Sequence, residues 1–188
     1  MKNLGNLNIN HDLKLVWIAP ERTGSRTQAT ILSYCGFVNN DKPVYFTNYY
    51  HYTHKTDESL IPEGYDIICG ARNPYDRVQS IYLNLFNQKN TVDFDSFLFD
   101  WFDKGNNLQM VQNPKLLSTR PKFILRMENL FEDFSSLPFI FNYLTEKQLK
   151  RLLIHERVRE ILPPITERCK SKIVEFCEPH FEMWGYKK

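Results

Sequence analysis

The chain has 188 residues, a formal net charge of +2, and 24 lysines and arginines against 22 aspartates and glutamates. This length predicts a single domain over residues 1–188 with a sizeable hydrophobic core. Hydrophobic residues make up 42% of the chain and charged residues 24%, which argues against intrinsic disorder. The near-balanced charge excludes a general polyanion binder, so we expect no nucleic-acid partner and any anion site must be built from a few placed residues.

Neither membrane insertion nor secretion is predicted. The sequence has no run of about 18 apolar residues, which a transmembrane helix requires. Its first residues lack an apolar stretch of signal-peptide length. The cysteines show no CxxC spacing, so we expect four reduced, packed thiols at Cys35, Cys69, Cys169 and Cys177. These features favour a cytoplasmic protein and leave its oligomeric state open.

The N-terminal half reads as short apolar strands, each followed by a helix. Residues 1–12 are polar and rich in Asn, so we predict a flexible arm there. A strand is expected over residues 15–19, then a tight loop and a helix that ends near Gly36. Further strands are predicted over residues 43–47 and 66–71. Asn73 and Pro74 fit the start of the next helix, because Asn caps helices well and Pro suits the first helical position.

The C-terminal half continues the alternation. Residues 94–102 show an apolar helical face opposite acidic residues, and a fourth strand is expected over residues 122–126. Thr145 and Gln148 have the spacing of a capping box, and residues 169–177 predict a last helix. Short strands that alternate with helices indicate an α/β domain with a mainly parallel central sheet flanked by helices.

The first strand–loop–helix junction is suited to an anion. A helix N-terminus presents backbone N–H groups and the positive end of the helix dipole, and a glycine lets the backbone approach a ligand closely. The alternative is a polar strand-to-helix turn with no ligand. The loop is not a Walker A motif, because GxxxxGK[ST] is absent. The candidate anion-binding residues are Arg22, Thr23, Gly24, Ser25, Arg26 and Thr27.

A second junction, which follows the strand over residues 66–71, has similar chemistry. Arg72 stands at the end of this strand, and Ser80 lies two helical turns further on. Ligands of open α/β sheets bind at the carboxyl ends of the strands, so both side chains suit a second anionic group. For Arg77 the simpler interpretation is a structural one, an ion pair with Asp76 or Asp66.

These two motifs resemble those of the sulfotransferases that use 3′-phosphoadenosine-5′-phosphosulfate (PAPS) as sulfuryl donor. The resemblance rests on residues 22–25 after a strand and on the spacing from Arg72 to Ser80. Residues 125–134 and 181–186 are similar to later segments of the Golgi-type and bacterial members. The matching segments run in the same order from about residue 14 to residue 186.

The resemblance implies a P-loop NTPase-like three-layer fold and a transfer of the sulfuryl group to an acceptor hydroxyl. The first loop, residues 22–27, would bind the 5′-phosphosulfate of PAPS. Arg72 and Ser80 would bind the 3′-phosphate of PAPS and of the product 3′-phosphoadenosine-5′-phosphate (PAP). The family usually has Lys where Arg22 stands. Arg22 stays charged and can stabilise the leaving oxygens, but it is a poor general acid.

The acceptor hydroxyl must lose a proton, so a base near the sulfur is expected. Related enzymes place a histidine upstream of the arginine that binds the 3′-phosphate, which points to His51 and, as the next choice, His54. Imidazole has a pKa near the operating pH. Carboxylates at Asp57, Glu58 and Glu63 remain alternatives. The two histidines have no third ligand close in sequence, so no metal is expected.

We expect the acceptor to be a glycan or a small molecule with a hydroxyl group. Two other functions stay open. One is a PAP- or glycan-binding module that has lost catalysis, which the arginine at position 22 allows. The other is a small-metabolite kinase, although the Walker lysine that it would use is absent.

Overall fold

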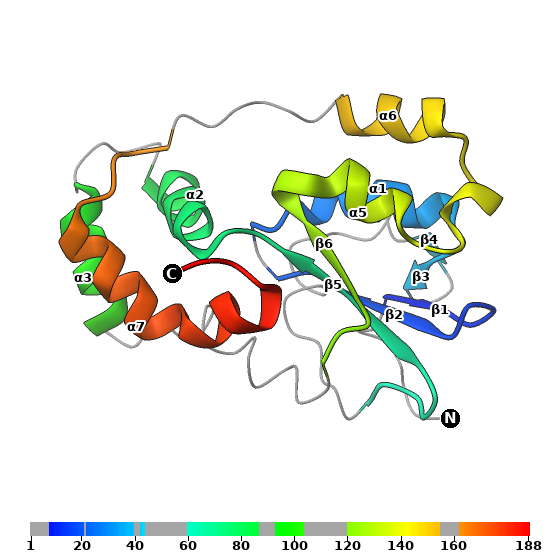
Figure 1. Cartoon of the computed structure of the whole chain (residues 1–188), viewed down its shortest axis with the longest axis horizontal. Helices are drawn as coiled ribbons and strands as arrows, with labels where there is room; N and C mark the ends of the chain where they lie inside the picture. Colours follow the sequence, from blue (N-terminus) through cyan, green and yellow to red (C-terminus); the bar gives the residue numbers. More distant parts are fainter. Residues whose placement is uncertain are drawn as a thin grey trace. The chain divides into compact units, whose positions relative to one another are not determined.

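The computed structural model describes residues 8–20, 22–39, 42–43, 60–86, 93–103, 120–154 and 162–188. Its backbone divides into two compact units (Figure 1). The first unit comprises residues 1–71 and 116–158, and the second comprises residues 72–115 and 159–188. Each unit is therefore built from two separate stretches of chain. That both belong to a single domain stays a prediction.

The first unit contains a six-stranded sheet of order β4-β3-β1-β2-β5-β6. Strand β5 pairs in parallel with β2 on one side and with β6 on the other, whereas β1, β3 and β4 pair antiparallel. A mixed α/β fold is thus confirmed, and the parallel arrangement holds for the β2–β5–β6 part of the sheet. The strand bounds are β1 Asn8–Asn10, β2 Leu15–Ile18, β3 Val38–Asn39, β4 Lys42–Pro43, β5 Asp66–Ala71 and β6 Phe123–Arg126.

The prediction of a flexible arm over residues 1–12 is wrong for residues 8–10, which form strand β1. Asn8, Ile9 and Asn10 are buried and pair with β2. The Asn10 side chain donates to the Cys35 carbonyl at 2.6 Å and accepts from the Leu13 N–H at 2.8 Å. The buried amide of Asn10 thus forms hydrogen bonds with backbone groups instead of water. Such bonds allow a polar segment to form a buried strand of the sheet.

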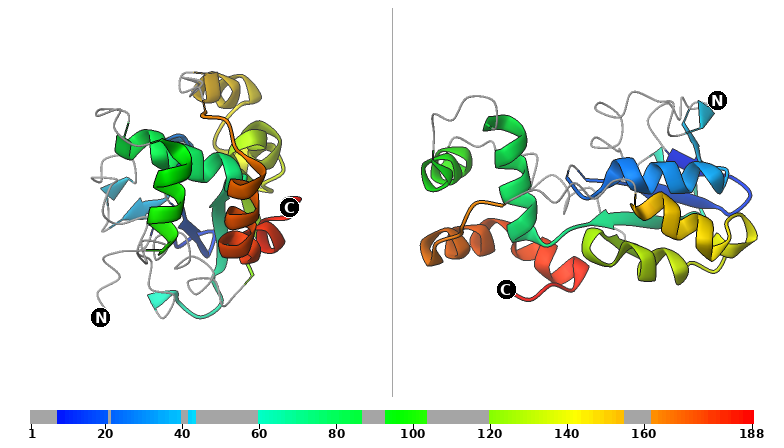
Figure 2. Two further views of the ribbon diagram at one scale, coloured as in Figure 1. Left: turned by 90° about the vertical axis from the view of Figure 1, so that its left-hand side faces the viewer. Right: turned by 90° about the horizontal axis from the view of Figure 1, so that it is seen from above.

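Helices α1 Ser25–Tyr34 and α5 Leu130–Ser135 of the first unit pack on one face of the sheet, and α6 Glu146–Ile154 packs against these two helices. Trp17 of β2, Ile68 of β5 and Leu125 of β6 belong to the same hydrophobic core as these helices. Figure 2 shows α1, α5 and α6 grouped beside these strands. The alternate strand residues Val16, Ile18, Ile67 and Cys69 are also buried, as is typical of parallel strands covered on both faces.

The described secondary structure of the second unit consists of helices. It contains α2 Pro74–Phe86, α3 Phe94–Asp103 and α7 Glu167–Trp184. The expected apolar stripes of the three helices form one core, and the Phe102 and Phe176 rings stack at a centroid distance of 4.3 Å. This core contains Val78 and Ile81 of α2, Phe94, Phe97, Leu98 and Phe102 of α3, and Cys169, Ile173, Cys177 and Phe181 of α7.

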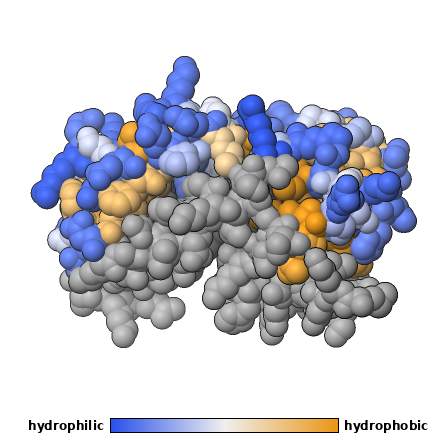
Figure 3. Space-filling model, turned by 90° about the horizontal axis from the view of Figure 1, so that it is seen from below, coloured by the Kyte–Doolittle hydropathy of each residue, from blue (hydrophilic) through white to orange (hydrophobic). Residues whose placement is uncertain are grey.

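The described surface shown in Figure 3 is mostly hydrophilic, with smaller hydrophobic areas between the hydrophilic ones. Among the described residues, the large hydrophobic side chains that stay exposed are Tyr34, Phe141, Tyr143 and Ile154. No described helix combines the length and the apolar character that a membrane span requires.

Candidate functional site

The loop between β2 and α1 has a backbone suited to an anion. Arg22 has a φ angle of 63° and Gly24 one of 78°, so two residues with left-handed φ flank Thr23. Backbones that alternate in handedness turn successive N–H groups toward one concavity, as in anion-binding nests. Helix α1 starts immediately afterwards at Ser25. The predicted residues 22–27 therefore lie together on one tight turn and the first helical turn.

The start of α1 retains its positive character. Gly24 is the N-cap residue and has no side chain with which to cap the helix. The first turn contains no acidic residue, and it carries Arg26, whose side chain is exposed. The N–H groups of a first helical turn have no acceptor within the helix. Backbone dipoles and arginine charge thus act in the same direction at this end of α1.

A buried amide holds the loop from inside. Gln28 of α1 is 0% exposed, and its Oε1 accepts a hydrogen bond of 3.1 Å from the indole Nε1 of Trp17. Its Nε2 donates to the Thr23 carbonyl at 2.7 Å and to the Leu125 carbonyl at 3.4 Å. Thr23 is also 0% exposed, and its hydroxyl donates to the Pro20 carbonyl at 2.6 Å. One side chain therefore ties the loop to β2 and to β6.

Two glycines allow the close packing around this amide. A Cβ atom at Gly70 of β5 would lie 2.5 Å from Oε1 of Gln28 and 2.9 Å from the Thr23 hydroxyl. A Cβ atom at Gly24 would overlap the sulfur of Met127, which lies in the short helix η3 Met127–Asn129. The loop is thus enclosed by β5 on one side and by the end of β6 on another.

Arg126 ends β6 at the same edge of the sheet, because Ala71 pairs with Arg126 and Cys69 pairs with Ile18 at the end of β2. Its backbone N–H donates to Asp133 at 2.6 Å and its guanidinium lies 3.2 Å from the same carboxylate. Burial raises the pKa of Asp133, and the two contacts with Arg126 oppose this effect. Asp133 thereby fixes both the backbone and the side chain at the end of β6.

The second motif begins at Arg72, which directly follows the last residue of β5 in the chain. The Asn73 side chain accepts from the Tyr75 N–H at 2.9 Å, so the predicted N-cap of α2 is confirmed. Arg72 is partly exposed, whereas Ser80 in the second turn of α2 is 0% exposed. Any contact between Ser80 and a ligand therefore requires that the ligand enter the packed side of α2.

Arg77 lies in the interior of the second unit. It is 1% exposed, and its guanidinium carbon lies 5.8 Å from the centre of the Trp184 ring. His180 is 1% exposed and its ring is 4.7 Å from that of Trp184. Burial, and next the positive charge of Arg77, lower the pKa of His180 to about 3. His180 is thus a neutral core residue.

The predicted bases His51 and His54 lie outside the described residues, as do Asp57 and Glu58. Glu63 is described and lies in an exposed turn before β5. Within the described part of the chain, no group of three His, Cys, Asp or Glu side chains is arranged to hold a metal ion.

The cysteines are buried free thiols. Burial raises the pKa of Cys35 and of Cys177 to about 12. Since the thiolate is the nucleophile, these two side chains are unreactive packing groups.

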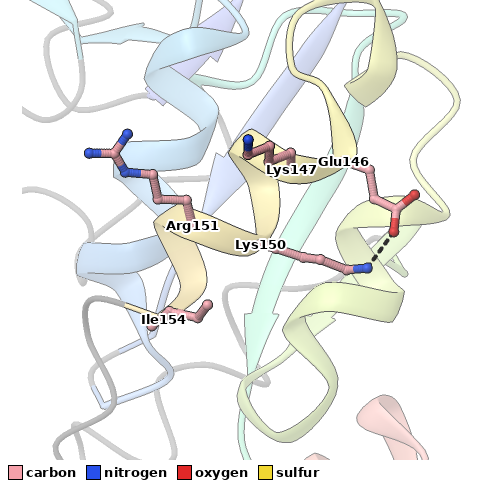
Figure 4. A pocket seen from close by; sticks show the side chains of 5 residues that line it. All are labelled: Glu146, Lys147, Lys150, Arg151 and Ile154. Atoms are coloured by element: carbon pink, nitrogen blue, oxygen red, sulfur yellow. Dashed lines mark hydrogen bonds and ion pairs between the residues drawn. The ribbon is translucent and has the colours of Figure 1, made fainter.

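A shallow hollow lies along α6 (Figure 4). Its described lining comes from a single helix: Glu146, Lys147, Lys150, Arg151 and Ile154. Lys150 pairs with Glu146 at 2.5 Å, whereas Lys147 and Arg151 point away from this pair. No buried polar side chain faces this hollow among the described residues, so its chemistry is that of an ordinary basic helix surface.

The role of Gln28 was not predicted from the sequence. The signal was present, because residues 28, 31, 32 and 35 form the inward stripe of α1, and Gln28 is the polar member of that stripe. Met127 and Gly70 carry no comparable signal, since their role depends on contacts between segments far apart in sequence.

Comparison of the chain with family models, curated proteins and solved structures gives no match.

Proposed function

We propose that the protein is a sulfotransferase that moves the sulfuryl group of PAPS to the hydroxyl of a glycan or small molecule. The observation that carries the proposal is the β2–α1 loop, with its left-handed residues Arg22 and Gly24 and a helix start without acidic residues. In this proposal the first loop binds the 5′-phosphosulfate, and Arg72 and Ser80 bind the 3′-phosphate. The P-loop-like three-layer fold is part of the same proposal.

The chemistry asks mainly for positioning and charge. The acceptor oxygen attacks sulfur as the bond from sulfur to the bridging phosphate oxygen breaks, so the charge that develops on the leaving oxygens must be stabilised. Backbone N–H groups of Gly24, Ser25, Arg26 and Thr27 are suited to this, together with the guanidinium of Arg22. Since Arg22 stays protonated, it stabilises charge and transfers no proton. No metal enters the scheme.

The proton of the acceptor hydroxyl goes to His51, with His54 as the alternative. Substitution of each histidine by Asn distinguishes them. The variant that lacks the base should lose about 10²–10⁴ in kcat while its affinity for PAP stays unchanged. If both variants keep full kcat, a carboxylate such as Glu63 takes the proton instead.

The donor site is tested by calorimetric titration of Arg72→Ala and Ser80→Ala with PAP and with AMP, which lacks the 3′-phosphate. Loss of Arg72 should weaken PAP binding about tenfold or more, because charged hydrogen bonds are lost, and should leave AMP binding unchanged. The loss for Ser80→Ala should be smaller. Arg168→Ala is the matched control, since Arg168 is exposed and lies 4.0 Å from the centre of the Phe99 ring. Unchanged PAP affinity in a folded Arg72→Ala would overturn the assignment.

One alternative keeps the same ligand. A PAP-binding module without catalysis is favoured by Arg22 in the position of the usual lysine, and it would bind PAP without turnover of PAPS. A small-metabolite kinase would instead prefer ATP over PAP.

A further inference from the structure

We propose that Gln28 is a positioning residue that sets the direction of the backbone N–H of Gly24 toward the 5′-phosphosulfate. The inference rests on the proposed function, since it concerns the same loop. It adds a residue that touches neither donor nor acceptor and acts through the peptide between Thr23 and Gly24.

The peptide unit between Thr23 and Gly24 has a fixed geometry. The carbonyl of Thr23 and the N–H of Gly24 belong to one planar trans peptide unit, in which the two groups point in opposite directions. Gln28 Nε2 donates to the Thr23 carbonyl at 2.7 Å. The direction of this carbonyl is therefore fixed from the side of α1, and the Gly24 N–H is turned to the opposite side.

Gln28 is itself held rigidly. Its Oε1 accepts from the Trp17 indole at 3.1 Å, and its Nε2 also reaches the Leu125 carbonyl at 3.4 Å. Trp17 and Gln28 are both 0% exposed, so water does not replace these partners. The absence of a side chain at Gly70 leaves the space that the amide occupies, 2.5 Å from where a Cβ atom would lie.

The residue type follows from the three bonds. The side chain must accept from an indole N–H and donate to a carbonyl at the same buried position. A glutamine amide provides both functions at one end of a flexible chain, whereas a carboxylate has no donor and a methionine thioether has no donor and is only a weak acceptor. A preorganised N–H stabilises the charge of a bound group without reorientation during the reaction.

The test compares PAP with adenosine 3′-phosphate, which lacks the 5′-phosphate that the loop would bind. Gln28→Met keeps the shape of the side chain and removes its amide. We expect its affinity for PAP to fall about tenfold or more, since a charge-assisted hydrogen bond is weakened. Its affinity for adenosine 3′-phosphate should stay within about twofold of the wild-type value. A general structural defect would weaken both ligands equally.

Asn10→Leu serves as the matched control. Asn10 is also a buried amide with two backbone partners, and it pairs with Leu15 at the other end of β2. Its loss should lower stability and leave the ratio of the two affinities unchanged. Trp17→Phe, which removes the indole donor to Gln28 together with part of the ring, supplies a second variant in case Gln28→Met does not fold. It should shift the affinity ratio in the same direction by a smaller factor.

The outcomes separate the two proposals. A folded Gln28→Met with the wild-type affinity ratio, or with equal losses for both ligands, would overturn the positioning role. Wild-type protein that binds adenosine 3′-phosphate as tightly as PAP would overturn the donor site itself, and the role of Gln28 with it. A selective loss of PAP affinity supports the inference.

Discussion

Polar side chains in the interior determine much of the local behaviour of this protein. The side chain of Gln28 forms a hydrogen bond with the loop before α1, and the side chain of Asn10 forms hydrogen bonds with Cys35 and Leu13. His180 differs from both, because neither ring nitrogen has a hydrogen-bond partner within the part of the chain that the structure describes. A buried histidine of this kind makes stability depend on pH.

We expect stability to fall below pH 6.5 because of His180. Its pKa is about 3 in the folded protein, against an ordinary value of 6.5, so the unfolded chain binds more protons between these values. The stabilisation is complete above pH 6.5 and is lost as the pH falls toward 3. By pH 5 the loss from this group is about 2 kcal/mol. Urea unfolding at pH 7.5 and at pH 5 measures the difference.

His180→Phe should remove most of this dependence between pH 7.5 and pH 5, because an aromatic ring without a proton site then fills the position beside Trp184. His11→Gln is the control, since His11 is an exposed histidine. An unaltered slope in His180→Phe would show that another group is responsible.

Gly70→Ala should destabilise the fold by about 1–3 kcal/mol through overpacking. Alanine is otherwise more favourable than glycine inside a strand. A decrease in the free energy of unfolding of Gly70→Ala therefore indicates the clash with Gln28 and Thr23. Gly64→Ala provides the comparison, because a Cβ there meets no atom within 4 Å and only the φ angle of 80° is strained. Chemical denaturation distinguishes the cases, and a stabilised Gly70→Ala would contradict the packing described around the amide.

At the level of helices, local sequence signals decide where elements begin. The capping box of α6 forms as predicted: the Thr145 N–H donates to Gln148 Oε1 at 2.8 Å, and the Gln148 N–H donates to the Thr145 hydroxyl at 3.3 Å. Thr145→Ala should therefore cost about 1 kcal/mol of stability.

Thr30→Ala is the matched substitution for Thr145→Ala. Thr30 lies within α1, where its hydroxyl donates a hydrogen bond of 3.1 Å to the Arg26 carbonyl one turn earlier. Alanine is the better helix former, so this change should be neutral or slightly stabilising. Thermal unfolding of both variants tests the contrast, and equal losses would argue against a specific cap at Thr145.

The elements with strong local signals were predictable from the sequence. Strand β5 covers residues 66–71 as predicted, and α2 starts at Pro74 after the expected cap. Strand β1 was missed because its side chains are polar and their partners, such as Cys35, lie elsewhere in the chain. The sequence predicted the residues of the β2–α1 loop but not its support, because Gln28, Gly70 and Met127 act through contacts between distant segments.

For the molecule as a whole, we propose two anion-binding motifs: the β2–α1 loop for a 5′-phosphate, and Arg72 with Ser80 for a 3′-phosphate. ADP and ATP lack the 3′-phosphate, so they separate the sulfotransferase proposal from the kinase alternative.

The most direct measurement is calorimetric titration of the wild-type protein with PAP, ADP and ATP under the same conditions. The account predicts that PAP binds about tenfold tighter or better than either nucleotide, because only PAP offers a phosphate to Arg72 and Ser80. A folded protein that gives no binding heat with PAP, or that prefers ATP, would contradict it.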